Sequence, residues 1–160
     1  MDLIMIFSAK YLIIVPIIIL GAYFLRQQGR SKKDMIVFAL LALVITYLIG
    51  LIGGYLYADP RPFVVGGFVP LIPHAADNGF PSDHALLASA LAMLGLYWNR
   101  KLGALLWLLA VIVAIARVYV GVHHAIDVIG SMIIAIAGVS IGYAVSNYLK
   151  SHPKPPHATA

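Results

Sequence analysis

The chain has 160 residues, of which 62% are hydrophobic and only 11% are charged, and its mean hydropathy is +0.95. A water-soluble domain carries about 25% charged residues, so the composition excludes an ordinary soluble protein and indicates an integral membrane domain without a nucleic-acid partner. The chain has no cysteine, which excludes disulfides and thiolate metal sites, and its formal net charge is +5.

Five apolar segments are long enough, or nearly long enough, to cross a bilayer as helices, which takes about 20 residues each. We expect these spans at about residues 4–25, 35–57, 83–98, 102–120 and 124–149. Proline removes a helical hydrogen bond and crowds the preceding turn, so Pro16 is expected to kink the first span. The predicted fold is an all-α integral membrane protein, a bundle of about five transmembrane helices in a single domain over residues 1–149.

The longest connection covers residues 58–82 and precedes the third span. Its glycines and prolines favour an ordered, turn-rich backbone over a helix. After the last span, residues 150–160 read "KSHPKPPHATA", a polar, proline-rich segment that we interpret as a disordered tail.

Eight of the eleven lysines and arginines lie in segments that five spans place on one side of the membrane. These are Arg26, Arg30, Lys32 and Lys33, then Arg100 and Lys101, and finally Lys150 and Lys154. The positive-inside rule assigns such segments to the cytoplasm. We therefore expect a cytoplasmic C-terminus and a 58–82 loop on the outer, extracytoplasmic face.

Three polar patches fall on that outer face: "ADPRPF" at 58–63, "FPSDHA" at 80–85 and "ARVYVGVHHAID" at 116–127. The first and third contain Arg61 and Arg117, and guanidinium groups bind oxyanions through paired hydrogen bonds. The second patch begins a helix, whose free N–H groups and partial positive charge also favour phosphate. The patches together predict a phosphate-binding site at the membrane surface.

Histidines in the same patches indicate phosphoryl transfer. His123 and Asp127 are four residues apart and share one face of a helix. A carboxylate in that position can hold one imidazole nitrogen and direct the other outward, as in nucleophilic catalysis. Histidines and aspartates could instead bind zinc. Because the adjacent arginines would repel a cation, we favour a site with no metal and no other cofactor.

The motifs resemble the three signatures of the type 2 phosphatidic acid phosphatase superfamily. They are "RP" at 61–62, "PSDH" at 81–84, and R-x5-H-x3-D from Arg117 through His123 to Asp127. Their order and spacing fit over about two thirds of the chain. "FPSDHA" and "ARVYVGVHHAIDVIG" look most like the bacterial undecaprenyl-diphosphatase branch.

The resemblance implies a role for each motif residue. His123 would be the nucleophile and form a phosphohistidine, with Asp127 orienting its ring. His84 would protonate the leaving oxygen and later activate water. The substrate phosphate would be held by Arg61, Ser82 and Arg117, with backbone N–H groups near Asp83 and His84.

Three positions depart from the family pattern: Asp83 stands where glycine is commoner, Ala116 stands where serine usually precedes the arginine, and Gly54 stands where lysine is usual. The superfamily usually places a lysine seven residues before the arginine of "RP", where this chain has Gly54. One hypothesis is that Lys10 leans over the site and partly replaces that lysine; the alternative is that it only reaches the headgroup region. The Asp83 carboxylate would repel phosphate, so we expect it to turn away and to cap its helix or pair with an arginine.

The resemblance implies an enzyme of the bacterial inner or plasma membrane. This enzyme would remove the terminal phosphate of undecaprenyl diphosphate or another polyprenyl diphosphate. The reaction would support recycling of the lipid carrier. Three alternatives stay open. The substrate could be phosphatidic acid or phosphatidylglycerol phosphate, the reaction could be phosphotransfer to a lipid acceptor, or the protein could bind or transport a phospholipid without cleaving it. The sequence gives no indication of oligomeric state.

Overall fold

The computed structural model describes residues 1–152, and the predicted tail segment 153–160 lies outside the described residues. The described chain is helical and contains no β-strand beyond one isolated bridge between Pro60 and Asn78. The helices are α1 (Asp2–Tyr11), α2 (Ile14–Leu25), α3 (Arg30–Leu56), α4 (Pro62–Gly66), α5 (Asp83–Trp98), α6 (Arg100–Tyr119) and α7 (Ala125–Ser151). The expected all-α membrane fold is confirmed.

The segment that was expected to form the first span consists of two helices, α1 and α2. α1 and α2 meet at a bend of 46°. The break lies at Leu12 and Ile13, four residues before the proline that was expected to cause a kink. That offset follows from proline chemistry, since the ring of Pro16 clashes with the carbonyl four residues earlier.

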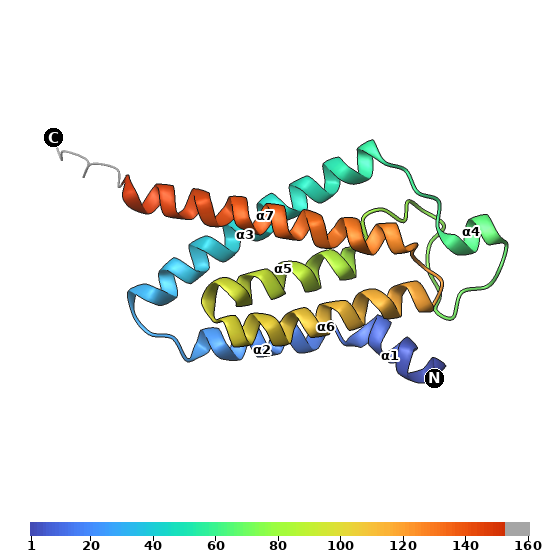
Figure 1. The fold of residues 1–160 in the computed structure, drawn as a ribbon, viewed down its shortest axis with the longest axis horizontal. Coiled ribbons are helices and arrows are strands. Elements are labelled where there is room, and N and C mark those ends of the chain that lie inside the picture. Colours follow the sequence, from blue (N-terminus) through green and yellow to red (C-terminus); the bar gives the residue numbers. More distant parts are fainter. Residues whose placement is uncertain (153–160) are drawn as a thin grey trace.

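α5 is the centre of the bundle (Figure 1), where it packs against both α6 and α7. Nine of its sixteen residues are buried, and most of these are alanine, serine or glycine. Small side chains let helix backbones approach closely inside a membrane. At the end of α5, a Cβ added at Gly103 of α6 would lie only 2.4 Å from the Leu96 Cα.

α3 and α7 form the second close pair. A Cβ on Gly142 of α7 would lie 2.5 Å from the Ala42 Cα of α3, and one on Gly138 would lie 2.6 Å from the Thr46 Cα. The two helices therefore touch backbone to backbone. At the far end of the same pair, Lys150 Nζ and Asp34 Oδ2 are 3.4 Å apart.

Three of these helices (α3, α6 and α7) are each long and apolar enough to cross a membrane, and the bent α1–α2 pair makes a fourth candidate. α5 has 16 residues and extends for about 24 Å, which is less than the hydrocarbon thickness of about 30 Å. The chain is an integral membrane protein, while the number of five spans stays a prediction.

The connection before α5 is mostly irregular, as expected, but the expectation that it lacks helix is wrong for α4. Pro62 starts that single turn, where its missing N–H has no helical partner to lose. Gly67 ends it in the left-handed region, with φ of 62°. This connection, the start of α5 and the α6–α7 turn gather at one end of the bundle (Figure 1).

Candidate functional site

The three predicted patches meet around His123, which lies in the short turn between α6 and α7. Arg61, at the start of α4, places its Nη1 3.3 Å from His123 Nε2. Arg117, in the last turn of α6, places its Nη2 3.4 Å from the same nitrogen. Both arginines are almost fully buried, with exposed fractions of 5% and 3%. Two guanidinium groups therefore converge on one imidazole nitrogen.

The other imidazole nitrogen faces a carboxylate. His123 Nδ1 lies 3.3 Å from Asp127 Oδ2, and Asp127 has no exposed surface. The same oxygen accepts the backbone N–H of His124 at 2.9 Å, which fixes the carboxylate at the start of α7. A protonated Nδ1 can donate a hydrogen bond to Asp127, and the lone pair on Nε2 then faces the arginines.

Burial is the main influence that lowers the pKa of His123 from its ordinary value of 6.5. The charges of Arg117 and Arg61 act in the same direction, whereas the hydrogen bond with Asp127 opposes them. The imidazole is therefore neutral at pH 7 and keeps a lone pair with which it can attack phosphorus.

Arg61 is held in place by the loop before α5. Its Nε donates to Asp77 Oδ1 at 2.7 Å, its Nη2 donates to the Asn78 carbonyl at 3.2 Å, and its Nη1 donates to the Val122 carbonyl at 2.9 Å. The Arg61 guanidinium holds the pKa of Asp77 below its usual range. Asp77 and Asn78 are positioning residues that sequence reasoning missed, because nothing in the spacing of a loop indicates which distant side chain it contacts.

The N-terminus of α5 brings the second patch to the same end. Ser82 is the N-cap and is fully buried, and its Oγ has no hydrogen-bond partner in the described chain. His84, in the first turn, is half-buried. Asp83 is exposed and lines one cavity together with Arg61, so its turning away from the phosphate stays a prediction. The further expectation for Asp83 is wrong, since within residues 1–152 its side chain neither caps α5 nor pairs with an arginine.

Comparison with known protein families identifies the family of this chain. The model of the PAP2 superfamily matches residues 35–151. The chain belongs to the PAP2 superfamily. It is therefore a membrane-embedded lipid phosphatase by family.

Individual PAP2 relatives agree in sequence and in fold. The undecaprenyl-diphosphatase BcrC of Bacillus subtilis is 40% identical over 139 residues, which cover 85% of this chain and 70% of that protein. The bacitracin transport permease protein BcrC of Bacillus licheniformis is 32% identical, over 81% of this chain and 64% of that protein. The crystal structure of Aquifex aeolicus LpxE superposes with a TM-score of 0.71 at 22% identity, covering 89% of this chain and 85% of that chain.

The position of the usual PAP2 lysine is crowded in this chain. A Cβ added at Gly54 would lie 3.0 Å from the Phe80 carbonyl oxygen and 3.4 Å from Pro81 Cδ. Asn78 holds the loop before α5 against the end of α3, because its side-chain amide donates to the Gly54 carbonyl at 2.9 Å. The loop before α5 therefore occupies the space into which a longer side chain would project.

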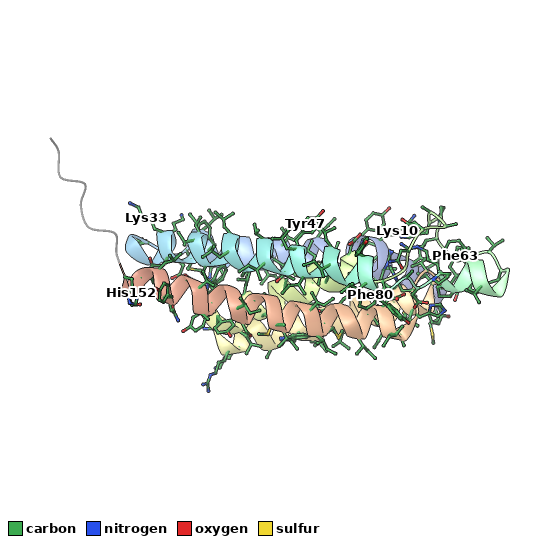
Figure 2. The ribbon with its side chains drawn as sticks, turned by 90° about the horizontal axis from the view of Figure 1, so that it is seen from above. Lys10, Lys33, Tyr47, Phe63, Phe80 and His152 are labelled. Atoms are coloured by element: carbon green, nitrogen blue, oxygen red, sulfur yellow. The ribbon has the colours of Figure 1, made fainter. Side chains whose placement is uncertain are left out.

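Lys10 does not take the place of that lysine by any contact in the described part of the chain. It is exposed at the end of α1 and has no ion pair or hydrogen bond there. Figure 2 places it at the same end of the bundle as Phe80. Its neighbour Ala9 is the residue that contacts the site, because the Ala9 carbonyl accepts a hydrogen bond from Arg117 Nη1 at 3.4 Å.

A carboxylate-rich cluster lies behind Asp127. His124 Nδ1 is 3.2 Å from Asp59 Oδ2, and one ligand atom from each of Asp59, His124 and Asp127 lies within 4.8 Å of the others. Burial, followed by the neighbouring Asp127 carboxylate, raises the pKa of Asp59. These distances would suit a metal ion. Because Asp127 Oδ2 already faces two nitrogen groups and the arginines are close, the donor set also suits a hydrogen-bonded network without metal.

Proposed function

We propose that this protein hydrolyses the terminal phosphate of undecaprenyl diphosphate, or of a similar polyprenyl diphosphate, through a phosphohistidine intermediate. The observation that carries the proposal is the environment of His123. Its Nδ1 faces Asp127, and its Nε2 faces the two guanidinium groups that would hold the phosphate being attacked. The name of the 40% identical Bacillus subtilis relative supports the choice of lipid.

The reaction would proceed in two steps. His123 Nε2 forms a bond to the terminal phosphorus while the bond to the bridging oxygen breaks, and His84 gives a proton to the departing lipid phosphate. His84 then takes a proton from water, which attacks the phosphohistidine and releases inorganic phosphate. Arg61, Arg117 and the α5 N-terminus at Ser82 and Asp83 would stabilise the charge on the transferring phosphoryl group.

A groove between α3 and α5 supports a substrate with a long apolar chain. One cavity of about 340 Å³ is lined by Leu43, Thr46, Tyr47, Leu86, Leu87 and Ala90, with Asp83 at its edge. The next cavity, of about 250 Å³, shares Tyr47, Asp83 and Leu86 with the first and reaches Arg61 and Asp77. An isoprenoid tail along α3 and α5 would place its diphosphate at the arginines.

We also propose that the site faces the periplasm or the outside of the cell, and that the C-terminus of α7 is cytoplasmic. The cations at the start of α3 and at the end of α7 support this orientation. Lys33 and His152 lie at the end of the bundle opposite Phe80 (Figure 2), and Lys150 contacts Asp34. The positive-inside rule assigns that end to the cytoplasm.

A second candidate is a transport or binding protein, which the name of the Bacillus licheniformis relative favours. Phosphate release by purified protein from undecaprenyl diphosphate, phosphatidic acid and phosphatidylglycerol phosphate separates the candidates. The proposal predicts the highest kcat/KM for the polyprenyl diphosphate, with water and not a lipid alcohol as acceptor. Binding of all three lipids without phosphate release would favour the transporter.

A further inference from the structure

His74 lies beside the candidate nucleophile, although none of the three signatures contains it. Its ring centroid is 6.0 Å from that of His123, and the ring planes meet at 76°. His74 Nδ1 is 3.3 Å from the Ala75 carbonyl oxygen. Because that oxygen can only accept, Nδ1 carries the proton when it bonds there, and Nε2 keeps a lone pair.

The loop holds His74 in this position from both sides. On one side, the Leu71 N–H donates to the Val120 carbonyl at 3.0 Å. Ile72 is only 2% exposed and packs in a cluster with Ala9 and Val120. On the other side, Asp77 binds Arg61. The segment is thus a strap fixed across the α6–α7 turn.

The site arginines already use part of their N–H groups on protein partners. Arg61 already donates to Asp77, Val122 and Asn78. Arg117 Nη1 donates to the Ala9 carbonyl, and its Nη2 faces His123. Arg117 Nε has no hydrogen-bond partner in the described chain and is free for substrate. Because a diphosphate presents several anionic oxygens, a further donor beside the two arginines would add a contact.

We propose that His74 is a further substrate-contacting residue, whose Nε2 binds an oxygen of the substrate diphosphate and takes up a proton from solvent as the anion enters. This inference rests on the proposed function. The charged or titratable groups around His74 are Arg61, Arg117, His123, His84 and Asp77. Burial, and then Arg61, lower the pKa of His74, so its ring is neutral in the free protein at pH 7. A bound phosphate would reverse this influence because it adds negative charge beside the ring.

Two variants of His74 separate a contact with substrate from a structural role. His74→Asn keeps a side-chain N–H that can reach the Ala75 carbonyl but removes Nε2. His74→Gln instead places an amide N–H near the Nε2 position. His152→Asn is the matched control, since His152 is exposed at the opposite end of the bundle (Figure 2).

For His74→Asn we expect kcat/KM toward the diphosphate to fall by about tenfold to hundredfold, the range for a charge-assisted hydrogen bond. Most of the loss should be in KM, and inhibition by orthovanadate, a phosphate analogue, should weaken by a similar factor. His74→Gln should recover part of both losses. His152→Asn should match the wild type, and all variants should keep the wild-type melting temperature without ligand.

Wild-type KM and orthovanadate inhibition in His74→Asn would overturn the inference. So would a loss of kcat and melting temperature with orthovanadate inhibition unchanged, because a structural role predicts that result. Orthovanadate binding can be measured as a rise in melting temperature. This measurement tests the contact between His74 and the phosphate analogue independently of turnover. If the wild type released no phosphate from the lipid, the proposed function would fail, while the binding comparison would still test His74.

Discussion

At the scale of residues, His123 combines a low proton affinity with a fixed orientation. Its burial and two neighbouring guanidinium groups disfavour the imidazolium, and Asp127 holds the ring through Nδ1. In the proposed mechanism, the first effect keeps His123 neutral, and the second determines which of its nitrogens attacks. Each effect can be tested separately.

The pH dependence of kcat/KM tests the charge of His123. Attack requires the neutral imidazole, and a lowered pKa means that this form persists as the pH falls through 6.5. We therefore expect the acid limb of kcat/KM to have its midpoint below pH 6.5. A midpoint at or above 6.5 in the wild type would show that burial and the arginines do not control this group.

Asp127→Asn tests the orientation of His123. The amide keeps the size of the side chain but loses the carboxylate that accepts the Nδ1 proton, so the ring can turn or adopt the wrong tautomer. We expect kcat to fall by roughly 10²–10⁴-fold. Asp34→Asn, near the start of α3 and far from the site, is the control and should retain activity. Equal turnover in both variants would remove Asp127 from the mechanism.

At the scale of elements, close helix pairs keep the site together. α7 carries Asp127 at its start and lies against α3 through Gly138 and Gly142. α3 ends just before Arg61. A shift between these two helices would therefore move the carboxylate and the arginine relative to each other.

Gly142→Ala tests this packing. The added Cβ would lie 2.5 Å from the Ala42 Cα, so the helices must separate. We expect a loss of about 1–3 kcal/mol in stability, as for other overpacked sites, and a lower melting temperature in detergent. Gly21→Ala in α2 is the matched control, because nothing lies within 4 Å of its added Cβ. Similar melting temperatures for the two variants would contradict the close contact.

The motifs were sufficient to predict that the three patches meet. Arg61, His84 and His123 each lie at the end of an apolar segment, and the alternation of the predicted spans places these three ends on the same face of the membrane. The contacts of the connecting loop could not be predicted. Asp77, Asn78 and His74 act through non-local contacts, which leave no periodic pattern in the sequence. A kink in the first span was predicted, but it lies one turn before Pro16, since proline disrupts the turn that precedes it.

At the scale of the whole molecule, the distribution of cations and the position of the site imply one orientation in the membrane. The chain has no cysteine, so single introduced cysteines report on topology without background. Val65 in α4 and Gln28 before α3 are both exposed and lie toward opposite ends of the bundle. Cysteines at these two positions would therefore report on the two sides of the membrane.

In intact cells, an impermeant thiol reagent should label Val65→Cys and should not label Gln28→Cys until the membrane is broken. The reason is that the positive-inside rule assigns the cationic end to the cytoplasm. The reverse pattern would overturn the proposed orientation and would place the site inside the cell.

The proposed function requires that His123 removes a phosphate from a lipid diphosphate without a metal ion. The most direct test measures phosphate release from undecaprenyl diphosphate in EDTA by the purified wild type and by His123→Ala. We expect steady release by the wild type and none above background by His123→Ala, with both proteins equally folded. Release that EDTA abolishes and zinc restores, or that survives the loss of His123, would contradict it.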